Sequence, residues 1–256
     1  MNTGKLTGLV WLAILALAIP TFSRAQEKVQ EKKDTQGAPR GESQPKASTT
    51  TAAVPIYTPP LRGAPGGRVG GGTRGSGREV FVLTVLAPDH SALTVSEQPS
   101  LYWYISSATS LPIELTVMDL RTTQPVLETR LAAPVTPGVH RIRLADHGVR
   151  LEPGVPYRWF VTVVPDSNRR SKDILAGGAI ERVEPPDGLP AKLAQARKEE
   201  TAFLYAEAGV WYEALAAISD QIDSAPNDAA LRKQRATLLA QVGLPPVGED
   251  GASTSR

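Results

Sequence analysis

Cysteine is absent from this 256-residue sequence. Its absence excludes disulfide bonds, and it also excludes a lipid-modified cysteine behind an export signal. Packing alone must then hold the folded part together, which favours a domain of ordinary size over a small cross-linked one. The formal net charge of +2 excludes no class of partner, so the positions of the charges carry more information than their sum.

Residue patterns typical of catalytic sites are also scarce. The three histidines, His90, His140 and His147, have no metal-ligand spacing such as His-Glu-x-x-His and are expected at the surface. No Gly-x-Ser-x-Gly nucleophile motif is present. Paired-carboxylate hydrolysis stays open, because 26 acidic residues offer many pairs and no spacing singles one out. We therefore predict no catalytic residue, metal or cofactor, and an unrecognised hydrolase is the least favoured alternative.

The N-terminus has the pattern of a secretory signal peptide. Lys5 supplies a positive charge, residues 9–19 form an unbroken apolar run, and small residues precede Gln26, where cleavage is expected. The run is shorter than the roughly 20 residues of a spanning helix, although an uncleaved anchor is the alternative. We predict removal of residues 1–25, no remaining transmembrane segment, and a periplasmic or extracellular location.

Three further segments have compositions that do not predict a packed core. Residues 26–56 are rich in Gln, Lys, Glu, Ser and Thr and contain few large apolar side chains, so a disordered stalk is predicted. Residues 57–78 combine proline, glycine and arginine with no acidic residue, and they form a lead-in to the fold. Residues 246–256 are predicted to be a disordered tail.

Short apolar runs bounded by turn residues occupy residues 79–185. Several alternate with period two, as in Leu101, Trp103 and Ile105. The pattern predicts an antiparallel β-sandwich of the immunoglobulin or fibronectin type. The expected strands are residues 80–86, 101–106, 113–119, 126–131, 139–144, 157–164 and 175–183.

Residues 151–157 have the Leu-x-Pro-Gly-x-x-Tyr form of a tyrosine corner. In such a corner the hydroxyl group, here that of Tyr157, bonds to the backbone just upstream and fixes the crossing between the two sheets. Trp103 is the expected large core residue, and Trp159 shares the strand face of Tyr157. A plain Pro-Gly turn before a strand is the alternative.

The periodicity becomes helical in residues 186–245. Three helices are predicted: residues 190–208, one around Trp211, and a third from Asn227 or Asp228 to Gly243. The segment resembles a tetratricopeptide repeat, because residues occur at the spacings of that pattern: Ala202, Tyr205, Gly209, Trp211, Ala214, Ile218 and Pro226. One and a half repeats cannot form the usual peptide groove, so we expect this hairpin to dock on the sandwich.

The chain also resembles an uncharacterised family of exported bacterial proteins, catalogued as domain of unknown function 928. The resemblance extends from about Tyr57 to Leu244, and it rests on motifs that occur in order: YTPP at 57–60, GGGTRG at 70–75, PSLYWY at 99–104, YRW at 157–159, RVEP at 182–185 and LYAEAGVWYEAL at 204–215. The family has no known activity, so the resemblance implies export and architecture without a mechanism.

Two positions depart from the family pattern. Members have a cysteine just after the Gly-rich motif and another after the Tyr-x-Trp strand, where this sequence has Gly77 and Pro165. The resemblance implies a disulfide between these positions in the family, since both cysteines are lost together here. It therefore predicts that Gly77 and Pro165 are neighbours in this chain as well.

Two basic features are candidate binding sites. In the Gly-rich motif, backbone N–H groups near Thr73 and the guanidinium group of Arg74 suit a carboxylate or phosphate, although the motif has no phosphate-loop ending. The favoured role of the motif is structural, namely to cover a sheet edge, and anion capture is the alternative. The second feature is the loop that contains Arg169 and Arg170. The two features form one basic patch if Gly77 lies beside Pro165.

The second feature also has a structural interpretation, which is the favoured one. In a solvated loop, Arg170 pairs with Asp173 instead of with a ligand.

The favoured function is an exported binding or scaffolding protein that contacts an envelope protein through the sandwich loops or the hairpin. Binding of an anionic glycan or cell-wall polymer through the arginine-rich surface is the alternative. Nucleic acid is not an expected partner, because the basic residues lack interleaved aromatic side chains.

Overall fold

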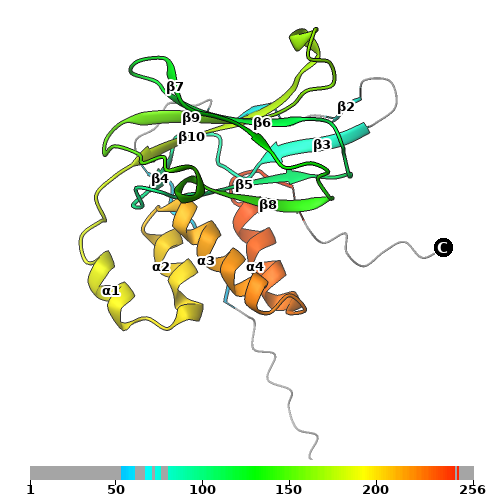
Figure 1. The fold of residues 1–256 in the computed structure, drawn as a ribbon. Helices are drawn as coiled ribbons and strands as arrows, with labels where there is room; N and C mark the ends of the chain where they lie inside the picture. The colour runs from blue at the N-terminus through cyan, green and yellow to red at the C-terminus, as the bar shows by residue number, and fades with distance from the viewer. Residues whose placement is uncertain (1–52, 61–66, 71–72, 76–79, 246, 248–256) are drawn as a thin grey trace, which may run out of the picture. The chain divides into compact units, whose positions relative to one another are not determined.

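The computed structural model of the chain describes residues 53–60, 67–70, 73–75, 80–245 and 247 (Figure 1). The predicted signal peptide, residues 26–52 of the predicted stalk, Gly77 and residues 248–256 lie outside this description. Among the described residues, antiparallel sheets precede four α-helices, so the fold is mixed β with α, as predicted. No helix in these described ranges is long and apolar enough to cross a membrane.

The first sheet contains six strands in the order β1-β10-β9-β6-β7, with β4 parallel to β10. All the other pairs are antiparallel. Its strands are β1 (Val69–Gly70), β4 (Ala92–Thr94), β6 (Ile113–Asp119), β7 (Gln124–Leu131), β9 (Pro156–Val163) and β10 (Ile174–Arg182).

The second sheet has four antiparallel strands in the order β2-β3-β5-β8. They are β2 (Thr73–Gly75), β3 (Val80–Val85), β5 (Ser100–Ile105) and β8 (Gly138–Arg143). Figure 1 shows this sheet between the first sheet and the helices, so the described part of the chain forms three layers.

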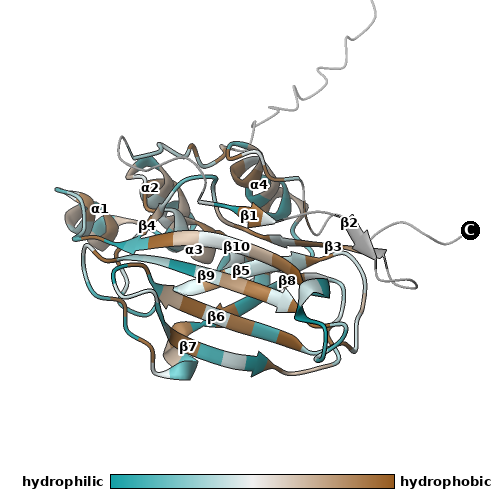
Figure 2. Cartoon of the chain, turned by 90° about the horizontal axis from the view of Figure 1, so that it is seen from above, coloured by the Kyte–Doolittle hydropathy of each residue, from teal (hydrophilic) through white to brown (hydrophobic). Residues whose placement is uncertain are grey.

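All seven predicted strands are present, and their ends differ from the prediction by at most two residues. The strands were predictable because apolar and polar residues alternate along them. In β6, Ile113, Leu115 and Val117 are buried and the residues between them are half-buried. Figure 2 shows this alternation of hydrophobic and hydrophilic residues along β6. The short strands β1, β2 and β4 were not predicted, since two or three residues are too few to establish a period.

Four helices follow the sheets: α1 (Leu189–Gln195), α2 (Thr201–Glu207), α3 (Trp211–Ser224) and α4 (Ala229–Ala240). The prediction of one helix over residues 190–208 is wrong. The backbone becomes extended at Ala196 and Arg197, and Arg197 forms a capping box with Glu200, whose carboxylate accepts a hydrogen bond from the Arg197 N–H at 2.9 Å. This cap starts a new helical segment, the 3-10 turn η3 (Lys198–Glu200), which leads into α2.

The predicted start of the last helix is present. The Asp228 carboxylate accepts hydrogen bonds from the backbone N–H groups of Ala230 and Leu231, which have no partner within the helix. Gly243, three residues after α4, has a φ of 69°. The left-handed conformation at this position suits glycine and ends the helical segment, as the sequence indicated.

Buried aromatic side chains join the helices to the sheets. The Trp211 Nε1–H of α3 donates to the Leu86 carbonyl at 2.9 Å. The Tyr212 hydroxyl accepts from Trp159 Nε1 at 2.9 Å and donates to the Ala179 carbonyl at 3.1 Å. Trp159, Trp211 and Tyr212 are at most 1% exposed and belong to a single hydrophobic core that includes both sheets. The helical hairpin is therefore packed as part of the fold.

Two further contacts hold segments outside the strands and helices in place. The Tyr157 hydroxyl accepts a hydrogen bond from the Glu152 backbone N–H at 3.1 Å, which is the contact expected of a tyrosine corner. Arg68, in the lead-in, donates to the carbonyls of Ala87 and Val242 at 3.4 and 3.3 Å. Arg68 thus binds the C-terminal end of the α4 segment, where helix carbonyls lack partners.

Candidate functional site

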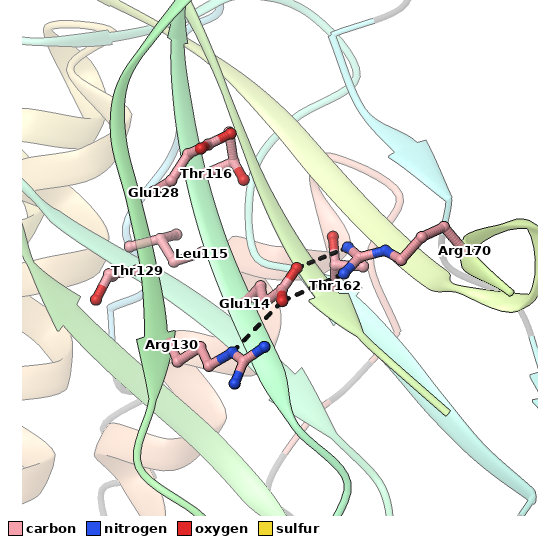
Figure 3. A pocket seen from close by; sticks show the side chains of 8 residues that line it. All are labelled: Glu114, Leu115, Thr116, Glu128, Thr129, Arg130, Thr162 and Arg170. Carbon is pink, nitrogen blue, oxygen red and sulfur yellow. Dashed lines mark hydrogen bonds and ion pairs between the residues drawn. The ribbon is translucent and has the colours of Figure 1, made fainter. Parts of the chain in front are cut away.

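The outer face of the first sheet carries a row of polar side chains. On β6, β7 and β9 the residues that alternate with the core positions point away from it, and the register places Glu114 opposite both Arg130 and Thr162. Together with Thr116, Glu128 and Arg170 they line a depression of 490 Å³, which we call the face depression (Figure 3).

A carboxylate with two guanidinium partners lies at the centre of the face depression. Arg170 makes a forked pair with Glu114, with Nη2–Oε2 and Nη1–Oε1 distances of 2.6 and 3.3 Å. Arg130 approaches the same carboxylate at 3.6 Å from the opposite side (Figure 3). Hydrogen bonding from Arg170 is the main reason that the pKa of Glu114 lies below its usual value. Glu114 is therefore ionised at neutral pH.

A second depression of 700 Å³ lies at the end of the sheet, beside the loop between β9 and β10, and we call it the end depression. Arg169 Nε contacts Asp166 Oδ2 at 2.5 Å, and the other oxygen of Asp166 accepts from the Asn168 N–H at 3.0 Å. The side-chain hydrogen bond from Arg169 is the largest cause of the lowered pKa of Asp166. Lys172, of the 3-10 turn η2 (Arg170–Lys172), lines the same depression.

Arg130 lines both depressions, so the two adjoin. The charges are distributed unevenly between them. The face depression has two basic and two acidic side chains, whereas the end depression has Arg130, Arg169 and Lys172 against Asp166 alone. The surface therefore changes from balanced charge on the sheet face to an excess of positive charge at the sheet end. A partner that spans both depressions meets this gradient.

Two of the predicted binding residues, Arg169 and Arg170, line these depressions. The pairing that the structural interpretation of this loop predicts is present, because Arg170 Nε contacts Asp173 Oδ2 at 2.7 Å. Arg170 is also bound by Glu114, which is 56 residues away in the sequence. The sequence analysis identified neither Glu114 nor Arg130, the second arginine that approaches this carboxylate. The only available signal was the period-two polar positions of two strands, and a single sequence does not reveal the register between them.

The other two predicted binding residues lie in a different sheet. Thr73 and Arg74 belong to β2, whose backbone pairs with Val82 and Phe81 of β3 at an edge of the second sheet. Their side chains are outside the description, as are Gly77 and Arg78. The expected contact between Gly77 and Pro165, and the single basic patch that depends on it, therefore stay predictions.

The remaining predicted positions are packing residues. Trp103 and Trp159 are buried in the core, and Tyr205 packs against it. The Trp103 ring stacks on His140 at 4.6 Å between ring centres. Within the described ranges, no group of three or more His, Asp or Glu side chains is arranged to hold a metal ion.

Comparison with known protein families gives one match over most of the chain. The profile of the family described as Domain of Unknown Function (DUF928) matches residues 69–250. This range includes both sheets, the four helices and every residue of the two depressions. No curated protein matches the sequence.

Proposed function

Because the chain belongs to the DUF928 family, whose description names no activity, we propose from the site and the N-terminal sequence that it is an exported, non-catalytic binding protein of the cell envelope. In this proposal the face and end depressions together recognise an envelope protein. The observation that carries it is the position of Arg130, which joins two depressions of 490 and 700 Å³ into one continuous charged surface. The apolar run of residues 9–19 supports export.

The electrostatics favour binding over hydrolysis. Carboxylate-pair hydrolysis needs one carboxyl group whose pKa is raised enough to donate a proton. Here the pKa values of Glu114 and Asp166, one in each depression, are both lowered by arginine side chains. Both groups stay ionised at neutral pH, which suits recognition of donors and positive charges on a partner.

The charge distribution favours a protein over an anionic polymer at the face depression. Arg170 is already bound by Glu114 and Asp173, so little of its charge is available to a polyanion. Protein surfaces present both signs of charge and can match such a mixed surface. The end depression supports the alternative, an anionic glycan or cell-wall polymer, because its basic side chains outnumber Asp166.

The finer architecture belongs to the same proposal. We interpret the two sheets as an immunoglobulin- or fibronectin-like sandwich, supported by the Tyr157–Glu152 contact. We interpret α2, α3 and α4 as a tetratricopeptide-like hairpin, supported by the buried small residues Ala202 and Ala214. In such a sandwich the loops at one end commonly carry function, and the end depression lies at such a loop.

Photo-crosslinking in cells tests the proposal. A crosslinking residue replaces exposed Glu128 in the face depression, and a matched control replaces exposed Gln195 on α1. We expect a discrete protein adduct from position 128 alone, and we expect the charge reversal Arg130→Glu to remove it. Equal adducts from both positions, or an adduct that survives Arg130→Glu, would contradict the site.

Salt distinguishes the two kinds of partner. Charge-driven capture of a polymer weakens as ionic strength rises, because screening shortens the range of exposed charges to about 8 Å at physiological salt and less above it. A discrete protein adduct whose yield falls less steeply with salt than capture of a polymer supports the favoured function, because a mixed surface of both charges also relies on short-range hydrogen bonds. Capture of wall polymer at the end depression that disappears in high salt, and that Arg169→Ala also removes, supports the alternative.

A further inference from the structure

Residues 53–60, which we call the strap, run along the helices without forming a helix or strand of their own. Two amide side chains of the α4 segment, seven residues apart and so on one helix face, bind the strap backbone. Gln234 Nε2 donates to the Ala53 carbonyl at 3.0 Å. Gln241 donates to the Pro55 carbonyl and accepts from the Tyr57 N–H, both at 2.8 Å.

The strap has the geometry of an extended bound peptide. Pro55 and Tyr57 are buried, whereas Ile56 and Thr58 are exposed, so alternate side chains face the helices. Proline favours an extended backbone in the residue before it, and Pro59 has this effect on Thr58. The Thr58 N–H completes the series of contacts by donating to the Ala206 carbonyl of α2 at 3.0 Å.

Tyr57 is the anchor of the strap. Its side chain is 6% exposed, and its ring packs edge-on against Trp211 at 5.0 Å between ring centres. The ring also stacks on His90 at 5.9 Å, and its hydroxyl makes a hydrogen bond with His90 Nε2 at 2.9 Å. A buried aromatic anchor combined with bonds to the peptide backbone is a recurring mode of peptide recognition.

The turn between α2 and α3 is shaped for the strap. Gly209 has a φ of 74°, and a Cβ atom at this position would lie 2.8 Å from the Thr58 carbonyl oxygen. Any larger residue would therefore meet both backbone strain and the strap itself. The helical layer leaves room for a backbone to pass at this point, as a binding site for a peptide must.

We propose that α2, α3 and α4 form a binding site for an extended, proline-flanked peptide with a tyrosine anchor, and that the strap of the same chain occupies this site. The site binds backbone groups and one aromatic side chain. A separate peptide of the same sequence therefore fits it when the strap is displaced. In the wild-type chain the resident strap closes the site to other peptides. This inference is independent of the two depressions on the first sheet.

Peptide binding to the full-length chain tests the proposal. The probe is a fluorescently labelled peptide of residues 53–60 (AVPIYTPP). We expect Tyr57→Ala, which removes the anchor of the resident strap, to bind the probe at least about tenfold more tightly than the wild type, because an occupied site lowers apparent affinity. Ile56→Ala is the matched control, since exposed Ile56 does not hold the strap in place, and it should behave as the wild type.

A second substitution identifies the site. In the Tyr57→Ala background, Gln241→Ala should weaken binding of the probe by about tenfold, since it removes two hydrogen bonds to the peptide backbone. A folded Tyr57→Ala chain that does not bind the probe, or that binds it equally well without Gln241, would overturn the proposal. A wild-type chain found as a dimer that exchanges straps would also overturn it, because the ligand would then come from a second copy.

Hydrogen exchange provides the test if Tyr57→Ala does not fold. Gln241 is exposed, so Gln241→Ala leaves the core intact. We expect the Tyr57 amide, whose acceptor is the Gln241 side chain, to exchange about tenfold faster in this variant, while amides of β5 are unchanged. An unchanged rate at Tyr57 would mean that the α4 side chains do not hold the strap, and the proposal would fail.

Discussion

The outer faces of the two sheets differ in what covers them. In the first sheet, β6 buries every second residue, and the intervening Glu114 and Thr116 line the face depression. In the second sheet, β5 buries five of its six residues, and Tyr102, which alternates with Trp103 along the strand, lies against α3. On the covered side, Arg141 of β8 pairs with Asp220 and Asp223 of α3.

This difference separates stability from recognition. The covered face contributes to the free energy of unfolding, because its aromatic side chains and their hydrogen bonds are removed from water. The open face contributes little, because exposed ion pairs are screened by solvent. Substitutions on the covered face should therefore lower the free energy of unfolding, whereas substitutions on the open face should weaken partner binding and leave stability nearly unchanged.

The largest effect is expected for Trp211→Ala at the covered face. The side chain is fully buried, and its loss also removes the donor to the Leu86 carbonyl. We expect the free energy of unfolding to fall by about 3–5 kcal/mol in urea denaturation. Phe160→Ala on the half-buried outer face of β9 is the control and should cost less. Equal costs at the two positions would remove the distinction between the faces.

Tyr212→Phe, at the next residue of α3, should have a smaller effect. The substitution keeps the ring and removes a hydroxyl that bonds two buried groups, the Trp159 Nε1–H of β9 and the Ala179 carbonyl of β10. We expect a loss of about 2 kcal/mol in the free energy of unfolding. Tyr205→Phe, at a half-buried ring, is the matched control and should be close to neutral. A neutral Tyr212→Phe would show that water replaces the lost hydroxyl.

The interface of α3 with the β4 loop predicts a pH dependence. Burial is the main cause that raises the pKa of Glu213, whose carboxylate accepts from Thr94 and from the Ser96 N–H. A raised pKa in the folded state means that stability is complete below the usual value of 4.5 and is lost as pH rises through the folded-state pKa.

Glu213→Gln should therefore gain stability relative to the wild type as pH increases above 4.5, as measured by urea denaturation between pH 4 and 8. The amide keeps an oxygen acceptor and has no charge to bury. Glu207→Gln on the exposed side of α2 is the control and should show no such trend. A constant difference between Glu213→Gln and the wild type across this range would contradict the raised pKa.

The smallest effect on stability is expected for Arg169→Ala at the end depression. Its side chain is 63% exposed, so the midpoint of thermal unfolding should not change. Capture of the envelope partner should weaken in the same variant, because the positive excess of the end depression is reduced. A lower midpoint with unchanged capture would assign Arg169 a structural role instead.

Sequence reasoning succeeded where the responsible contacts are local. The period of β6 identified its buried face, and the spacing of three residues between Arg170 and Asp173 allowed their pairing to be predicted. It failed at the break between α1 and α2. Ala196 and Arg197 are neither glycine nor proline, and the break depends on a capping contact that apolar periodicity does not reveal.

The candidate site was only half visible for the same reason. Arg169 and Arg170 are consecutive in a polar loop that the sequence alone makes evident. Glu114 and Arg130 come from two different strands, and their meeting depends on a register that places them opposite each other. A shift of β7 by one residue would turn Arg130 toward the core, so tertiary packing, and not composition, determines this half of the site.

The strap gives the chain an unusual order of events during synthesis. Ala53 leaves the ribosome 181 residues before Gln234, the first of its partners on α4. At about 5–20 residues per second, the strap waits roughly 10–40 s before its site exists. The strap, although synthesised first among the described residues, is therefore among the last segments to bind its partners. In a chain truncated before α4, the strap would lack these contacts and would be open to proteases.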